Sequence, residues 1–217
     1  MPTSVMRDET GSVLVEVTVV MTIMFVFLLG SIEFLFVFYQ WNVASKAVEI
    51  GLRIAAVSDP VASGVSGLSL AILNSELDPG ERMPYFSVTC DGGTETCTCD
   101  IRGVCPKNIS YNSAAMGTII FGRGSSSCSD ATSSYNTGMC DIFSRITPAN
   151  VVIAYTQTGL GFTGRPGGPS PTITISLKDL PLKSYFLGGL MRFEDIRIPA
   201  MKMSMTAEDI SSRAPAF

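Results

Sequence analysis

The chain has 217 residues, carries a formal net charge of −4 and contains no histidine. Its Lys and Arg residues are scattered along the sequence and form no basic cluster, which argues against binding to a nucleic-acid backbone. Without histidine, the chain lacks the commonest general base and the commonest zinc ligand, so most hydrolase mechanisms are disfavoured. We therefore expect a protein that is not an enzyme and needs no cofactor.

An apolar segment from Gly11 to Tyr39 organises the rest of the sequence. As a helix, the 27 residues from Val13 to Tyr39 would be about 40 Å long, more than the ~30 Å hydrocarbon core of a bilayer. A secretory signal peptide has a shorter apolar core, and its cleavage site follows that core. The segment therefore predicts a transmembrane helix preceded by a cytoplasmic leader, residues 1–11.

Helical periodicity continues beyond the apolar segment. Between residues 42 and 57, apolar side chains fall on one stripe and charged side chains on another. Lys46, Glu49 and Arg53 have the spacing of helical ion pairs. Asp59-Pro60 predicts the end of the helix. We expect one helix over residues 12–58, apolar all round in its first half and amphipathic in its second.

Residues 59–217 are expected to form one extracytoplasmic head domain. Its fold class is predicted as α+β, with the long N-terminal helix packed on an antiparallel sheet that carries a disulfide-stapled loop region. The strand patterns and one short helix are read from apolar alternation and flanking turn residues. The helix is expected at 68–77, and the strands are expected at 84–90, 151–155, 172–177 and 196–205.

All six cysteines lie in an irregular region rich in Ser, Gly and Asn, residues 90–145. An even number of cysteines in an exported domain predicts disulfides, and six cysteines allow 15 pairings among which the sequence does not choose. A zinc site is the less favoured alternative, because histidines and paired C-x₂₋₄-C knuckles are missing. The cysteines are Cys90, Cys97, Cys99, Cys105, Cys128 and Cys140.

Two further patterns carry little functional weight. Residues 159–164 match G-x-G-x-x-G, but Arg165-Pro166-Gly167 follows in place of the helix that a dinucleotide site requires, so we expect a hairpin loop. Four aspartates near the cysteines offer carboxylates for calcium, but they lack the spacing of an EF-hand. They are Asp91, Asp100, Asp130 and Asp141.

Gly11 stands at the start of the apolar run, and Glu16 follows five residues later. This arrangement resembles the class III signal of type IV pilins and pseudopilins, which a prepilin peptidase cuts after a glycine. The resemblance implies cleavage after Gly11, a new N-terminus at Ser12, and a contact between Glu16 and the amine of a neighbouring subunit. In the alternative, Glu16 lies in the headgroup region of an uncleaved signal anchor.

Glu33 lies 17 residues after Glu16, about 25 Å along a helix axis, and so falls close to the opposite membrane interface. Two interpretations remain open. The carboxylate either reaches the far headgroups by snorkelling or contacts a partner subunit or an assembly platform within the membrane.

Three features together resemble the TadE-like pseudopilins of tight-adherence pili. They are the G-S-x-x-V-E start, the Gly30 to Glu33 motif followed by aromatics, and the helical segment 47–56 with its basic residue. Val17 and the segment EIGLRIA depart from the family pattern, so a TadE-like role, a TadF-like role and that of a more distant minor pseudopilin all stay open.

The resemblance implies a minor pseudopilin for pilus assembly, initiation or the tip. The expected partners are other pilin and pseudopilin subunits, the prepilin peptidase and the inner-membrane assembly platform. The expected location is the inner membrane, in a single pass with a cytoplasmic N-terminus and a periplasmic head, with incorporation into the pilus. The alternative is an uncleaved single-pass envelope protein whose head binds a ligand or acts as an adhesin.

Overall fold

The computed structural model describes residues 9–73, 77–128, 136–165, 168–185, 196–197, 201–207 and 210. Most of the predicted leader and Asp130 lie outside the described residues. The chain forms two compact units. The first combines Met1–Gln40 with Pro181–Ile196, and the second combines Trp41–Leu180 with Arg197–Phe217.

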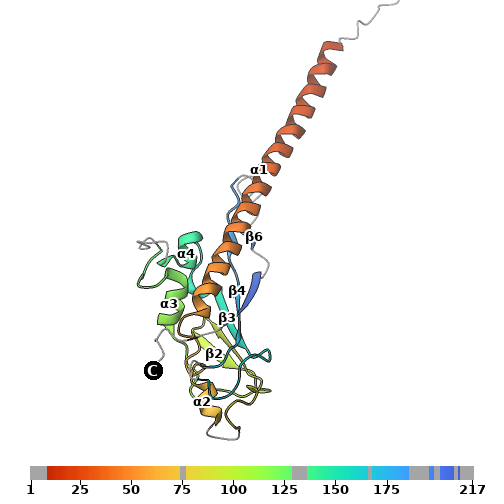
Figure 1. Cartoon of the computed structure of the whole chain (residues 1–217). Coiled ribbons are helices and arrows are strands. Elements are labelled where there is room, and N and C mark those ends of the chain that lie inside the picture. Colours follow the sequence, from red (N-terminus) through yellow and green to blue (C-terminus); the bar gives the residue numbers. More distant parts are fainter. Residues whose placement is uncertain are drawn as a thin grey trace, which may run out of the picture. The chain divides into compact units, whose positions relative to one another are not determined.

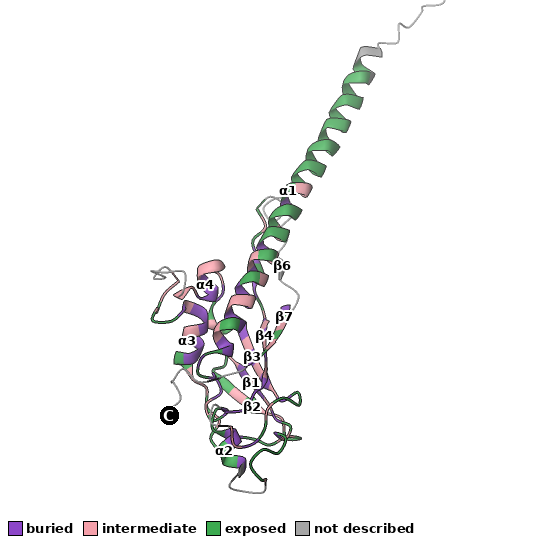
Figure 2. Ribbon diagram, viewed as in Figure 1, coloured by how far each residue is buried: buried purple, intermediate pink, exposed green. Residues whose placement is uncertain are grey.

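The predicted long helix is confirmed. Helix α1 runs from Glu9 to Ala56 (Figure 1), so it begins within the predicted leader and ends just before Asp59-Pro60. Its N-terminal half is exposed, whereas apolar side chains from Ala44 to Ala56 are buried (Figure 2). The change from exposure to burial follows the change in the sequence from an apolar to an amphipathic pattern.

The predicted antiparallel sheet is also confirmed, and it has five strands in the order β2-β1-β3-β4-β7. The pattern over 196–205, expected to be one strand, is divided instead between β6 and β7, which belong to different sheets. Strands β5 (Pro181–Leu182) and β6 (Ile196–Arg197) form a separate two-stranded sheet. The strands of the main sheet are β1 (Ser87–Asp91), β2 (Thr96–Cys99), β3 (Val151–Thr156), β4 (Thr172–Leu177) and β7 (Met201–Thr206).

Alternation of side chains gives the main sheet one buried face. In β3 the residues Val151, Ile153 and Tyr155 are buried, and the residues between them are half-buried. Ile153 pairs with Ile175 of β4, and Tyr155 pairs with Ile173. Because successive side chains of a strand point to opposite faces, this register places the apolar residues of both strands on one face.

Short helices complete the head, and two of them lie in the cysteine-rich region that the sequence left unassigned. Asn112 caps the start of helix α3, and its side chain accepts hydrogen bonds from the backbone N–H groups of Ala114 and Ala115. It ends at Gly122, where φ is 87°. The helices are α2 (Leu68–Leu73), α3 (Ser113–Phe121), α4 (Met139–Ile142) and the 3₁₀ turn η2 (Pro148–Asn150).

The C-terminal half of α1 contacts both the helices and the sheet of the head. At Gly51 a Cβ would meet the side chain of Met139 in α4 and, at 3.4 Å, that of Ile119 in α3. The Ser45 hydroxyl lies 3.3 Å from the sulfur of Met201 in β7. A residue without a side chain therefore lets α1 approach α4 closely.

Tyr155 connects the sheet to the chain that leaves α1. Its side chain is fully buried, and its phenol oxygen accepts a hydrogen bond of 2.9 Å from the backbone N–H of Val61. Burial raises the pKa of the phenol far above its usual range, so Tyr155 stays neutral and available as a partner. The bond satisfies a buried N–H group that belongs to no helix or strand.

We predict that Tyr155→Phe destabilises the head by about 1–3 kcal/mol, because the buried N–H of Val61 loses its acceptor. Urea unfolding of the full chain in detergent, followed by near-ultraviolet circular dichroism, measures the change. The control is Tyr85→Phe, at a residue with 45% exposure, where little change is expected. Equal stabilities for the two variants would contradict the role of this bond.

Candidate functional site

The residues of the predicted processing signal lie on the exposed part of α1. Gly11 is exposed, and beyond its own turn of helix no described atom lies within 4 Å of the position where a Cβ would stand. Ser12 follows it in the helix, and Glu16 is exposed one turn further on. No ion pair of Glu16 occurs within the part of the chain that the structure describes. Its carboxylate is therefore accessible to a second molecule.

The exposed apolar part of α1 fits a single-pass membrane anchor. One helix, within Val13–Ala56, is long and apolar enough to cross a membrane, and the mean hydropathy of its most apolar window is 2.5. None of that window is buried, so it is not the core helix of a folded domain. The hydroxyls of Thr18, Thr22 and Ser31 donate to carbonyls of their own helix, each at 2.8 Å. These bonds satisfy the hydroxyls without water.

Glu33 is buried although the apolar residues around it are exposed. Only 3% of its surface is accessible, and its carboxylate accepts a hydrogen bond of 2.8 Å from the backbone N–H of Tyr185. Tyr185 belongs to the segment Pro181–Tyr185, which we call the strap. The strap lies in the same compact unit as the N-terminal part of α1.

Gln40 binds the strap at a second point. Its side-chain carbonyl accepts a hydrogen bond of 3.0 Å from the backbone N–H of Lys183, and its amide group donates one of 3.0 Å to the carbonyl of the same residue. Gln40 stands seven residues after Glu33, two helical turns away on the same face. Both polar side chains of this face therefore hold backbone groups of the strap.

Aromatic contacts accompany these hydrogen bonds. The ring of Phe36, between the two polar residues, lies 5.1 Å from the ring of Tyr185. The ammonium group of Lys183 lies 5.5 Å from the centre of the same ring, within the range of a cation–π interaction. The strap thus presents a tyrosine and a lysine beside the helix.

The sequence indicated Glu33 but not its partner. Gln40 was also missed, although its i+7 spacing from Glu33 on one face of an apolar helix was a usable signal. The strap itself carries no motif, and its sequence, PLKSY, is that of an ordinary surface segment.

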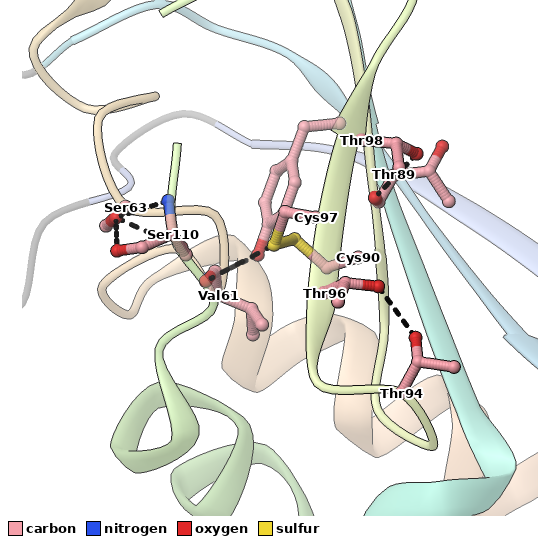
Figure 3. Close-up of a disulfide and its surroundings, with 10 residues drawn as sticks. Val61, Ser63, Thr89, Cys90, Thr94, Thr96, Cys97, Thr98 and Ser110 are labelled. Atoms are coloured by element: carbon pink, nitrogen blue, oxygen red, sulfur yellow. Dashed lines mark hydrogen bonds between the residues drawn. A yellow bond between two sulfur atoms is a disulfide. The ribbon is translucent and has the colours of Figure 1, made fainter. Parts of the chain in front are cut away.

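The predicted disulfides are confirmed, and each joins one cysteine to the next cysteine along the chain. Figure 3 shows the bond between Cys90 and Cys97, which stand opposite each other in β1 and β2. The Cys97 sulfur lies 4.0 Å from the carbonyl oxygen of Val61, and two residues further along the chain the hydroxyl of Ser63 is hydrogen-bonded to that of Ser110. The other bridges are Cys99–Cys105 and Cys128–Cys140.

The aspartates considered for calcium have separate partners in the head. Asp91 pairs with Lys178 at 2.5 Å, and Asp100 pairs with Arg102 at 3.0 Å. Hydrogen bonds from these cations lower the pKa of both carboxyls below their usual range. Asp141 accepts from the backbone N–H of Gly138 at the start of α4. Each described aspartate of this group therefore has a local structural role.

The G-x-G-x-x-G segment connects two neighbouring antiparallel strands, β3 and β4, as a hairpin loop does. Gly159, Gly161 and Gly164 have φ values of 95°, 82° and 81°. Such values suit the turns of a loop, because side chains rarely allow them. The expectation of a hairpin loop is confirmed.

We predict that Gln40→Ala speeds tryptic cleavage after Lys183, because the strap loses the two hydrogen bonds between Gln40 and the backbone of Lys183 and keeps only the one to Glu33. The solubilised full chain is digested briefly, and mass spectrometry follows the new termini. Cleavage after Lys107, an exposed residue of the head, is the internal control and should not change. Equal rates after Lys183 in the two proteins would show that Gln40 does not restrain the strap.

Comparison with known proteins agrees with the resemblance seen in the sequence. Residues 11–53 match the model of the family described as TadE-like protein. No curated protein and no solved structure matches the chain. The matched segment contains Gly11, Glu16, Glu33 and Gln40, and its family indicates a protein related to tight-adherence pili. The N-terminal segment of this chain is thus similar to the TadE-like family, in agreement with its sequence motifs.

Proposed function

We propose that the protein is a minor pseudopilin of a tight-adherence type IV pilus and contributes to pilus assembly, initiation or the tip. The observation that carries this proposal is the position of the TadE-like match, residues 11–53, which covers the exposed apolar part of α1. A helix that exposes apolar side chains all round can pack against other helices. The protein acts as a structural subunit, without catalysis.

The proposed location is the inner membrane, with the leader in the cytoplasm and the head in the periplasm. Three disulfides support this orientation, because such bonds form and persist in oxidising compartments. Other pilin and pseudopilin subunits, a prepilin peptidase and the assembly platform are the partners. From the membrane, the subunit moves into the pilus.

Glu16 is proposed to set the register between subunits. A carboxylate at the middle of a membrane costs roughly 2.5–3.5 kcal/mol, and a partner of opposite charge lowers the cost of placing Glu16 among apolar helices. After cleavage between Gly11 and Ser12, the positively charged α-amino group of Ser12 on a neighbouring subunit is that partner. The assembly role of Glu33 is proposed to be indirect, through the strap that it holds.

The second candidate is an uncleaved envelope protein with a ligand-binding or adhesin head. One observation favours it. Ile101 is 95% exposed on the loop that the Cys99–Cys105 bridge closes. A short closed loop that displays a large apolar side chain suits recognition of a partner, because little conformational entropy is lost on binding.

We predict that the protein from a host with the prepilin peptidase begins at Ser12. N-terminal mass spectrometry identifies the terminus, and Gly11→Leu serves as the uncleaved control because a bulky side chain hinders approach of the protease. An intact leader in the wild-type chain would refute processing and favour the second candidate.

We predict that Glu16→Ala leaves cleavage intact but impairs piliation severely, since loss of one partner from a buried ion pair costs about 3–5 kcal/mol. Glu16→Asp should restore part of the piliation because it keeps the charge. Thr22→Ala, on the same exposed stretch of helix, is the matched control and should assemble normally. Normal piliation in the alanine variant would remove Glu16 from the mechanism.

A further inference from the structure

We propose that the strap, Pro181–Tyr185, lies in the lipid–water interface on the head side of the membrane, and that Glu33 and Gln40 hold it there. The partner of this surface is a phospholipid bilayer. The proposal rests on insertion of α1 into a membrane and not on pilus assembly. An experiment that disproves the pilus function therefore leaves the contact of the strap with the membrane untouched. It gives the chain a second membrane contact, far from the first in sequence.

The position of the strap along α1 is the first argument. The exposed apolar stretch begins at Val13, and 20 residues from there, to Ile32, span about 30 Å, the thickness of the hydrocarbon core. Glu33 comes directly after these 20 residues, and the exposed apolar side chains that follow it in α1 end at Tyr39. The ring of Tyr185 packs on Phe36, roughly one turn further from the membrane centre. The strap therefore lies at the depth of the headgroups.

Its backbone hydrogen bonds are the second argument. Irregular backbone near a hydrocarbon phase needs protein partners for its polar groups, because water is scarce there. Gln40 satisfies both backbone groups of Lys183, and Glu33 satisfies the N–H of Tyr185. A strap surrounded by water would not require buried side chains of an apolar helix for this purpose.

The exposed side chains are the third argument. Tyr185 is 54% exposed and Tyr39 of α1 is 65% exposed, and tyrosines concentrate at membrane interfaces. The ammonium group of Lys183 stands beside the Tyr185 ring, where it suits the phosphates of anionic lipids. The sequence that follows Tyr185, FLGGLM, is apolar; its placement lies outside the described residues.

A neighbouring protein subunit is the competing partner for this surface. Lipid is favoured because the strap is continuous with the exposed apolar face of α1, and because the carboxylate of Glu33 is already bound within the chain. A bilayer accepts tyrosine and lysine side chains without a complementary shape, whereas a subunit would need a matching surface.

Tryptophan fluorescence in lipid vesicles tests the depth of the strap. The chain contains a single tryptophan, so Trp41→Phe gives a silent background for three reporters in the full chain. Tyr185→Trp reports on the strap, Val20→Trp on the middle of the span, and Tyr85→Trp on the head. Quenchers are phospholipids brominated near the headgroup or near the chain end, and acrylamide in water.

Shallow bromines should quench the Tyr185→Trp reporter, deep bromines the Val20→Trp reporter, and acrylamide alone the Tyr85→Trp reporter. If the strap reporter responds only to acrylamide while the span reporter is inserted, the proposal is wrong. Shielding of the strap reporter from both quenchers indicates a protein contact and also overturns it. If the span reporter is not quenched by lipid, insertion and the strap contact fail together.

A second substitution tests the role of Glu33 in the same background. Glu33→Leu removes the acceptor, and Glu33→Gln keeps an acceptor oxygen of similar size. With Tyr185→Trp as reporter, the leucine variant should lose quenching by shallow bromines and gain quenching by acrylamide, whereas the glutamine variant should retain the original pattern. Unchanged lipid quenching in the leucine variant would show that Glu33 does not hold the strap.

Discussion

The hydrogen bonds between the strap and the side chains of Glu33 and Gln40 form where α1 changes from exposed to buried, and the N-terminal unit of the structure depends on them. An apolar helix offers no backbone donors or acceptors along its sides, since its own ladder uses them. A non-helical segment can pack there only if side chains of the helix supply partners. Glu33 and Gln40, two turns apart on one face, meet this need.

The same constraint explains why the two halves of α1 look different. On the N-terminal side of the residues that bind the strap, the helix exposes large apolar side chains, and its hydroxyls donate to carbonyls of the same helix. On the C-terminal side, small residues such as Ala44, Ala47 and Gly51 let the helix approach the elements of the head. One helix thus combines an exposed apolar surface, which fits a membrane anchor, with the close packing that a domain core needs.

Features set by local periodicity could be predicted from the sequence. The helix, the alternating strands β3 and β4 and the disulfide bonding of the cysteines all follow from spacing that a single segment contains. Other features depend on which distant segments meet in the folded chain. They are the position of the strap, the hydrogen bond between Tyr155 and Val61 and the choice among disulfide pairings. Cys90 faces Cys97, for example, only because the hairpin pairs β1 and β2 in that register. Spacing along the chain does not reveal such contacts.

Glu16 and Glu33 lie on different faces of α1, so each carboxylate can have a different partner. Glu33 lies 17 residues after Glu16, which places the two about 100° apart around the helix axis. The strap occupies the face of Glu33, so the face of Glu16 stays open along the apolar stretch. A neighbouring subunit that binds Glu16 therefore does not have to displace the strap. With this geometry, one molecule can hold its strap through Glu33 and bind a neighbouring subunit through Glu16. A subunit that moves from the membrane into a filament would therefore keep its strap, while the surroundings of Glu16 change from the membrane to the neighbouring subunit.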